Sequence, residues 1–168
     1  LREQVVSILR EDPFELVLGD DASSDDSVRI VEDLVAVHRD AGGSTELVVR
    51  RHDPALGVVA NFADGLAHAR GELVALSDQD DIWHEGKLAT LAAAFDADPE
   101  LLLVHTDARL VDAGGSPTGL TLLQALEATP GERAGLERGD AFATLLRRNL
   151  VTGATVMLRR RVADAAAP

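Results

Sequence analysis

Apolar side chains along the first half of the chain recur with the periods of helices and strands in alternation. Residues 1–10 carry apolar side chains on one helical face, which Pro13 ends, whereas residues 14–19 form a run with the length of a buried strand. Strands that alternate with helices of this length indicate a mostly parallel sheet with helices on both faces, so we predict an α/β fold. The predicted helices that follow cover residues 26–39 and 57–69, and the predicted strands cover 46–50 and 72–77.

The second half of the chain has a less regular pattern. Between residues 116 and 139 the pattern favours a loop with a short helix. The segment 108–111 ends at a turn over residues 112–115, and we expect it to pair with a later strand. The remaining predictions are helices over 87–95 and 140–147 and strands over 101–106 and 153–158.

Composition narrows the class of protein. The chain has 168 residues, of which 46% are apolar, so we expect a single domain over residues 1–168. A formal charge of -13 repels nucleic-acid phosphates and anionic membrane surfaces, which argues against a nucleic-acid partner. The absence of cysteine excludes disulfides, thiolate zinc sites and cysteine nucleophiles. No apolar run reaches the roughly 20 residues of a membrane span, and the first residues do not resemble a signal peptide, so we expect a soluble chain.

The most informative feature is the group of carboxylates at Asp78, Asp80 and Asp81, directly after the predicted strand 72–77. Carboxylates this close repel one another, which implies a compensating cation, Mg²⁺ or Mn²⁺. A divalent ion held by one or two carboxylates keeps open positions for substrate phosphates, so we predict a nucleotide-activated substrate. Because the net negative charge repels an anionic substrate, such a substrate must be bound by local groups, such as a metal ion, backbone N–H groups or a helix N-terminus.

Simpler explanations of the acidic group differ in how well they fit. A solvated acidic turn remains an alternative, because aspartate favours turns and helix caps. A calcium EF-hand is excluded, since its loop needs Asp or Asn at position 82 and Gly at position 83, where this chain has Ile82 and Trp83. The sequence also lacks a Walker A motif, a GxGxxG fingerprint and a GxSxG elbow.

A second acidic pair, Asp20 and Asp21, follows the predicted strand 14–19. Either residue can cap the next helix, and either can bind a ligand, since ligands collect at the carboxyl ends of parallel strands. Trp83 is either a core anchor or a platform at the rim of a pocket. The histidines show no metal-ligand spacing, and His105 near Asp107 is the one that merits attention.

The order of these motifs resembles the family 2 glycosyltransferases, inverting sugar-nucleotide enzymes with the GT-A (Rossmann-like) fold. The DQDDIW run at 78–83 and the N-x-VTG-x-T run at 149–155 resemble the rhamnosyltransferase-type members that build bacterial surface polysaccharides. The matching blocks cover residues 3–9, 15–25, 57–72, 75–83 with Lys87 and Leu88, and 149–155.

The resemblance implies a role for each matching residue. Asp21, with Asp20 and Ser23 beside it, contacts the donor base; Asp78 faces the ribose and sugar of the donor; and Asp80 binds the metal together with Asp78. Asp81 and Trp83 shape the donor pocket, and Asp78, Asp80 and Asp81 form the catalytic group. Thr152 and Gly153 line the acceptor side.

The chain also departs from the family. Family members begin with a strand and a loop placed before the helix that opens this chain, and they carry the general base in a segment, often HDWW, that has no counterpart before Pro168. We therefore expect an internal portion of a longer enzyme that does not turn over by itself. Loss of the first strand opens the middle of the sheet and leaves ladder groups unpaired.

The expected function is metal-dependent transfer of a sugar from a dTDP-rhamnose-like or UDP-sugar donor to a saccharide or lipid-linked acceptor in surface polysaccharide synthesis. We expect it in the cytoplasm at the inner face of the membrane, with peripheral membrane association through the missing regions. Two alternatives remain: a nucleotidyltransferase, for which a glycine- and basic-rich N-terminal loop is lacking, and a non-catalytic receiver-like metal-binding module. The receiver needs a lysine at the end of a later strand, whereas the one lysine, Lys87, lies in a predicted helix.

Overall fold

The computed structural model describes residues 1–138 and 140–166, which divide into two compact units. The large unit contains residues 1–104 and the chain from Met157 onward, and the small unit spans His105–Val156. Strands β4 (Leu103–His105) and β7 (Val156–Arg159) each extend by one residue into the small unit. The other elements of the large unit are α1 (Arg2–Leu9), β1 (Glu15–Asp21), α2 (Ser27–Asp40), β2 (Glu46–His52), α3 (Val58–His68), β3 (Leu73–Ala75), α4 (Lys87–Ala97) and α8 (Arg160–Ala166).

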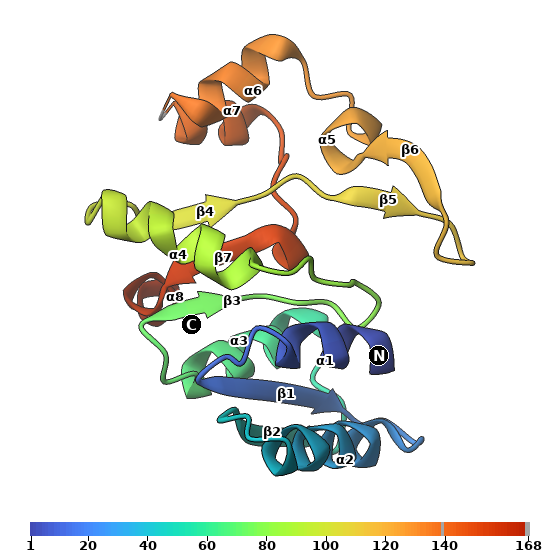
Figure 1. The fold of residues 1–168 in the computed structure, drawn as a ribbon. Coiled ribbons are helices and arrows are strands. Elements are labelled where there is room, and N and C mark those ends of the chain that lie inside the picture. Colours follow the sequence, from blue (N-terminus) through green and yellow to red (C-terminus); the bar gives the residue numbers. More distant parts are fainter. Residues whose placement is uncertain (139, 167–168) are drawn as a thin grey trace. The chain divides into compact units, whose positions relative to one another are not determined.

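Strands β1 and β2 form a parallel pair joined by α2 (Figure 1). Along β1, the side chains of Leu16 and Leu18 point to one face of the strand and that of Val17 points to the other. Leu16 and Leu18 pack against a core that α1 and α2 supply together. The buried members of this core are Val5, Leu9, Val31 and Val35. Helix α3 lies on the opposite face of β1, where Gly65 approaches Val17.

A second sheet of the large unit has the strand order β3-β7-β4. Strand β7 is antiparallel to β3, with Val74 opposite Leu158. Helix α4 covers this sheet through Leu91 and Phe95, which pack against Met157 of β7. These apolar contacts form a core separate from the one beneath α1 and α2.

The predicted α/β class is confirmed, but the mostly parallel continuous sheet is not found. In the described residues β1 and β2 form one small sheet, β3, β7 and β4 another, and no ladder joins β1 to β3. The antiparallel pairing of β7 with β3 depends on a chain return from a distant segment, which a local pattern of apolar residues does not encode.

The small unit consists of a hairpin and short helices. Strands β5 (Arg109–Val111) and β6 (Pro117–Thr121) pair antiparallel across the 112–115 turn, as expected for residues 108–111. Thr121 and Thr129 each form a reciprocal capping box at the start of a helix. The helical elements of this unit are α5 (Leu122–Ala125), α6 (Pro130–Glu137), α7 (Ala141–Arg147) and the 3₁₀ turn η1 (Gly153–Thr155).

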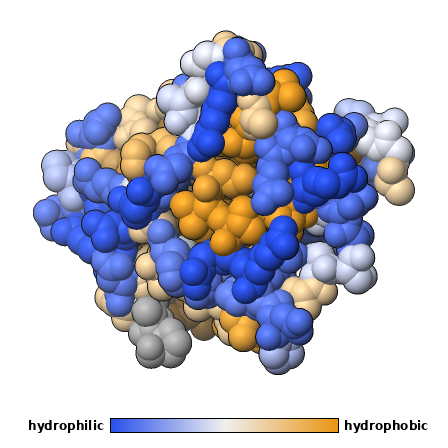
Figure 2. Space-filling view, turned by 90° about the horizontal axis from the view of Figure 1, so that it is seen from below, coloured by the Kyte–Doolittle hydropathy of each residue, from blue (hydrophilic) through white to orange (hydrophobic). Residues whose placement is uncertain are grey.

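Several predicted elements need correction. The 116–139 segment holds a strand and two helices in its described residues rather than a loop with one helix, because capping boxes stabilise helices too short to show periodicity. Residues 153–155 are a 3₁₀ turn, and only Val156–Arg159 is a strand. Val58, an apolar residue at the start of α3, is 73% exposed. The face shown in Figure 2 is mainly hydrophilic and carries an apolar area near its centre.

Candidate functional site

The acidic group lies in a loop that follows β3. Strand β3 ends at Ala75, two residues earlier than predicted, and the chain then turns with the Asp81 N–H donating to the Asp78 carbonyl at 3.4 Å. Asp78 is half-buried, whereas Asp80 and Asp81 are exposed. The loop therefore presents carboxylates at the carboxyl end of a strand, where ligands of α/β proteins collect.

The carboxylates of this loop are close enough to repel one another. The pKa of Asp81 is raised first by burial and then by the charges of Asp80 and Asp78, while the charge of Lys87 opposes the shift. Repulsion of this kind is relieved when a cation binds, so the loop favours a positively charged ligand.

The side chains of Lys87 and Trp83 lie close together beside the acidic loop. The Lys87 ammonium lies 4.4 Å from the centre of the Trp83 ring, a distance at which the ring attracts a cation. Burial lowers the pKa of Lys87, and the charges of Asp81 and Glu11 oppose that shift. Trp83 is 8% exposed, and its backbone N–H donates to Ser7 Oγ at 2.9 Å. Of the two roles considered for Trp83, the structure therefore supports a buried anchor.

Helix α1 and the turn after it fix both ends of the acidic loop. At the first end, Gln4 Nε2 donates to Ser77 Oγ at 3.0 Å. At the second, the Glu11 carboxylate accepts from the backbone N–H groups of Gly86 at 2.8 Å and Leu88 at 3.0 Å. Glu11 thus supplies acceptors for the first amides of α4, which have no partner within the helix.

These anchoring residues were not among the sequence-predicted site residues. Gln4 and Ser7 are three residues apart on α1 and share a helical face, and both are buried. Buried polar side chains beside an apolar stripe are a usable signal, because they require hydrogen-bond partners elsewhere in the fold.

The second acidic pair belongs to β1 itself, which extends two residues beyond the predicted strand 14–19. Asp20 accepts a hydrogen bond from the Ser23 N–H at 3.3 Å. Asp21 accepts from the N–H groups of Leu56 at 2.6 Å and Gly57 at 2.9 Å. Asp21 therefore binds the backbone at the start of α3, whereas the alternative weighed from sequence was a cap on the helix that directly follows β1.

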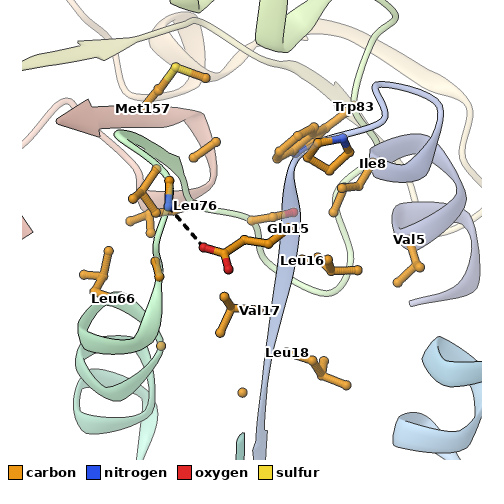
Figure 3. Close-up of a pocket in the computed structure, with 18 of the residues that line it drawn as sticks. Val5, Ile8, Glu15, Leu16, Val17, Leu18, Leu66, Leu76, Trp83 and Met157 are labelled. Atoms are coloured by element: carbon orange, nitrogen blue, oxygen red, sulfur yellow. Dashed lines mark hydrogen bonds between the residues drawn. The ribbon is translucent and has the colours of Figure 1, made fainter. Parts of the chain in front are cut away.

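An apolar cavity of about 430 Å³ lies between β1 and β3 in the large unit (Figure 3). Leu16 and Leu18 of β1, Leu66 of α3 and Met157 of β7 line it. Its lining also includes Gly19, Ser77, Gln79 and Trp83, the chain neighbours of the two acidic groups. At the start of β1, Glu15 accepts a hydrogen bond from the Gly71 N–H at 3.2 Å.

The residues available for a metal are the carboxylates of Asp78 and Asp80. Within residues 1–138 and 140–166, no group of three or more His, Asp or Glu side chains is arranged to hold a metal ion. Two carboxylates supply hard oxygen ligands of the kind that Mg²⁺ uses when water and substrate phosphates complete its coordination. The donor set therefore fits a metal bound with its substrate.

The predicted acceptor-side residues, Thr152 and Gly153, lie in the small unit. The Thr152 carbonyl accepts hydrogen bonds from the Thr155 N–H at 3.0 Å and from Thr155 Oγ1 at 2.8 Å. Asp107, noted for its proximity to His105, accepts instead from the backbone N–H of Leu123 at 2.9 Å.

Comparison with known proteins gives the family. The sequence model described as "Glycosyl transferase family 2" matches residues 1–164. Uncharacterised proteins of Mycobacterium bovis and of two strains of Mycobacterium tuberculosis are each 33% identical over 107 residues, an alignment that covers 63% of this chain and 30% of each relative. In the described residues no helix is both long enough and apolar enough to span a bilayer. The chain belongs to glycosyltransferase family 2.

Proposed function

We propose that this chain carries the donor-binding part of an inverting glycosyltransferase. Such an enzyme transfers a sugar from a nucleoside-diphosphate sugar, dTDP-rhamnose-like or UDP-linked, to a saccharide or lipid-linked acceptor in surface polysaccharide synthesis. Family membership supports the general class. The observation that supports a diphosphate-bearing donor is the acidic loop after β3, which gathers Asp78, Asp80 and Asp81 at the end of a strand and in which burial and then the charges of Asp80 and Asp78 raise the pKa of Asp81.

The proposed roles are those that the resemblance to family 2 implies for each matching residue. Asp78 and Asp80 hold Mg²⁺ or Mn²⁺, and Asp78 also faces the ribose and sugar of the donor. Asp81 and Trp83 shape the donor pocket. The Trp83 backbone N–H donates to Ser7 Oγ, and the Lys87 ammonium lies over the Trp83 ring. The remaining proposed assignments are Asp20, Asp21 and Ser23 for the donor base and Thr152 and Gly153 for the acceptor side.

Departure of a nucleoside diphosphate requires neutralisation of the charge that develops on its phosphate oxygens. A bound divalent ion supplies that neutralisation as a Lewis acid. The chain itself contributes the carboxylates that would hold the ion, and the Lys87 ammonium lies over the Trp83 ring beside them. Inversion also requires a base that takes the acceptor hydroxyl proton.

The test uses the native full-length polypeptide, Mn²⁺ and a panel of radiolabelled dTDP-, UDP- and GDP-sugars. We expect release of the nucleoside diphosphate from one donor class, and a loss of at least 100-fold in that release for Asp80→Asn. The matched control is Asp96→Asn, which changes an exposed carboxylate on α4 and should leave the rate unchanged. Turnover of no donor, or equal rates for Asp80→Asn and Asp96→Asn, would overturn the proposal.

A further inference from the structure

One polar face of α1 and of the turn after it contacts the acidic loop at successive points. Gln4, Ser7 and Glu11 are spaced three and four residues apart, which is the spacing of a single helical face. The Glu11 N–H donates to the Ile8 carbonyl at 3.0 Å, so the turn continues the direction of the helix as far as Glu11. The other buried residues of α1 are apolar, and polar side chains placed among them require hydrogen-bond partners elsewhere in the fold.

The partners of this polar face follow the order of the loop. Each residue of the face has a partner further along the loop than the one before, and the pairs are Gln4 with Ser77, Ser7 with Trp83, and Glu11 with Gly86 and Leu88. The carboxylates of residues 78, 80 and 81 lie between the first and the second of these contacts. The backbone is therefore held on both sides of the charged residues.

These contacts oppose the repulsion within the loop. Burial and then the charges of Asp80 and Asp78 raise the pKa of Asp81, so separation of the carboxylates would relieve unfavourable charge. Hydrogen bonds on both sides limit that separation. A site that is already assembled binds its ligand more tightly, because less ordering accompanies binding.

Glu11 makes two of the contacts with one charged group. Its two carboxylate oxygens accept from different backbone N–H groups, at 2.8 Å for Gly86 and at 3.0 Å for Leu88, and hydrogen bonds to an ionised group are stronger than those between neutral groups. The charges of Glu11 and Asp81 also stabilise the same ammonium, that of Lys87. Glu11 therefore acts on the acidic loop through the backbone at the start of α4 and through the cation beside Asp81.

We propose that Glu11 is a positioning residue for the metal-holding carboxylates of the acidic loop. Its role depends on the proposed function, in which Asp78 and Asp80 hold the ion. By fixing the turn that leads into α4, Glu11 keeps residues 78–81 in an arrangement that a divalent ion can bridge. Without Glu11 the carboxylates separate, and a higher metal concentration is needed to bring them together.

The test compares the Mn²⁺ dependence of Glu11→Ala with that of the wild type in the native full-length polypeptide. Electron paramagnetic resonance measures bound Mn²⁺, and release of the nucleoside diphosphate is followed over a series of Mn²⁺ concentrations. We expect Glu11→Ala to need about 10-fold more Mn²⁺ for half-saturation in both measurements, as is usual when a group that orients metal ligands is lost. The maximal rate at saturating Mn²⁺ should stay close to that of the wild type. A variant that is merely unstable would show the reverse, a lower maximal rate with the same Mn²⁺ dependence.

Two further variants keep the test decisive if Glu11→Ala folds poorly. Glu11→Gln retains one carbonyl oxygen as an acceptor but loses the charge, so its Mn²⁺ requirement should lie between those of Glu11→Ala and the wild type. Ser7→Ala removes the acceptor of the Trp83 N–H and should also raise the Mn²⁺ requirement. The matched control is Glu3→Ala, which removes an exposed carboxylate from α1 and should leave the requirement unchanged.

The possible outcomes separate the role of Glu11 from the proposed function. If the wild type binds Mn²⁺ and the Glu11 variants behave like Glu3→Ala, the positioning role is overturned while the proposed function stands. Mn²⁺ binding without turnover of any donor would contradict the proposed function alone, since the resonance measurement still decides the role of Glu11. Absence of Mn²⁺ binding by the wild type, with and without a nucleoside diphosphate, would overturn the proposed metal site and the role of Glu11 together.

Discussion

The carboxylate of Asp21 lies 2.9 Å from the backbone nitrogen of Gly57, the residue that precedes the first turn of α3. A second hydrogen bond, from the Leu56 N–H, uses the other carboxylate oxygen. The end of β1 is thereby joined to the start of α3, although 35 residues separate Asp21 from Leu56 in the sequence. The same side chain is our proposed contact to the donor base, so its structural and binding roles can be separated by mutation.

Asp21→Ala should lower the free energy of unfolding by about 1 kcal/mol, because it removes the acceptor of the Leu56 and Gly57 N–H groups and a typical hydrogen bond contributes about this much. Asp21→Asn retains one amide oxygen as an acceptor and should lose less. Urea denaturation followed by circular dichroism measures both values. Asp33→Ala, which removes an exposed carboxylate from α2, is the control and should change stability by less than about 0.5 kcal/mol. Equal stability of Asp21→Ala and the control would contradict a structural role for these two hydrogen bonds.

Gly19 is required because the side chain of Asn61 lies against its α-carbon. A Cβ added at Gly19 would come within 2.6 Å of Asn61 Oδ1, and Asn61 Nδ2 donates to the Gly19 carbonyl at 3.2 Å. Gly19→Ala should therefore destabilise the chain by about 1–3 kcal/mol, the usual cost of overpacking. Adding Asn61→Ala to Gly19→Ala should recover part of the loss in thermal denaturation. A double variant less stable than Gly19→Ala would contradict a steric origin.

Ala22 adopts φ of 63°, a left-handed conformation that costs alanine more than glycine. Ala22→Gly should consequently raise the free energy of unfolding by about 0.5–1 kcal/mol, even though it removes a methyl group. Ala97→Gly, at the end of α4, is the matched control and should lower it, because alanine there is helical. Differential scanning calorimetry compares the two, and the same sign for both variants would refute the conformational explanation.

Asp12 makes stability depend on acid pH. Hydrogen bonds from the Ser44 N–H and from His38 hold the pKa of Asp12 well below its usual range. A pKa that is lower in the folded state contributes stability above the unfolded-state value of about 3.9, and this contribution is lost as the pH falls below that value. Wild type should therefore lose stability more steeply than Asp12→Asn between pH 5 and about 2.5 in urea titrations. Parallel curves for the two proteins would contradict this.

Strand and helix periods identified the elements of the first half because each period arises from local geometry. Helices α1 and α2 lie within one or two residues of the predicted ranges 1–10 and 26–39. The 116–139 prediction was wrong for its described residues, because Thr121 and Thr129 stabilise short helices through capping boxes that carry no apolar period.

The candidate site was only partly predictable. Adjacent aspartates identified the loop at 78–81, because their repulsion can be inferred from sequence spacing alone. The sequence can signal that Gln4 and Ser7 need hydrogen-bond partners, but it does not identify those partners or the partners of Glu11, since these contacts join residues more than 70 positions apart.

The sequence by itself determined the family, the helices and strands of the first half, and the position of the acidic loop, since each depends on neighbouring residues. Only the tertiary structure decided that β7 pairs antiparallel with β3 and that Asp21 binds the backbone directly before α3. It also decided that an apolar cavity separates β1 from β3. These features arise from contacts between segments distant along the chain, where packing and hydrogen-bond satisfaction, rather than local periodicity, select the arrangement.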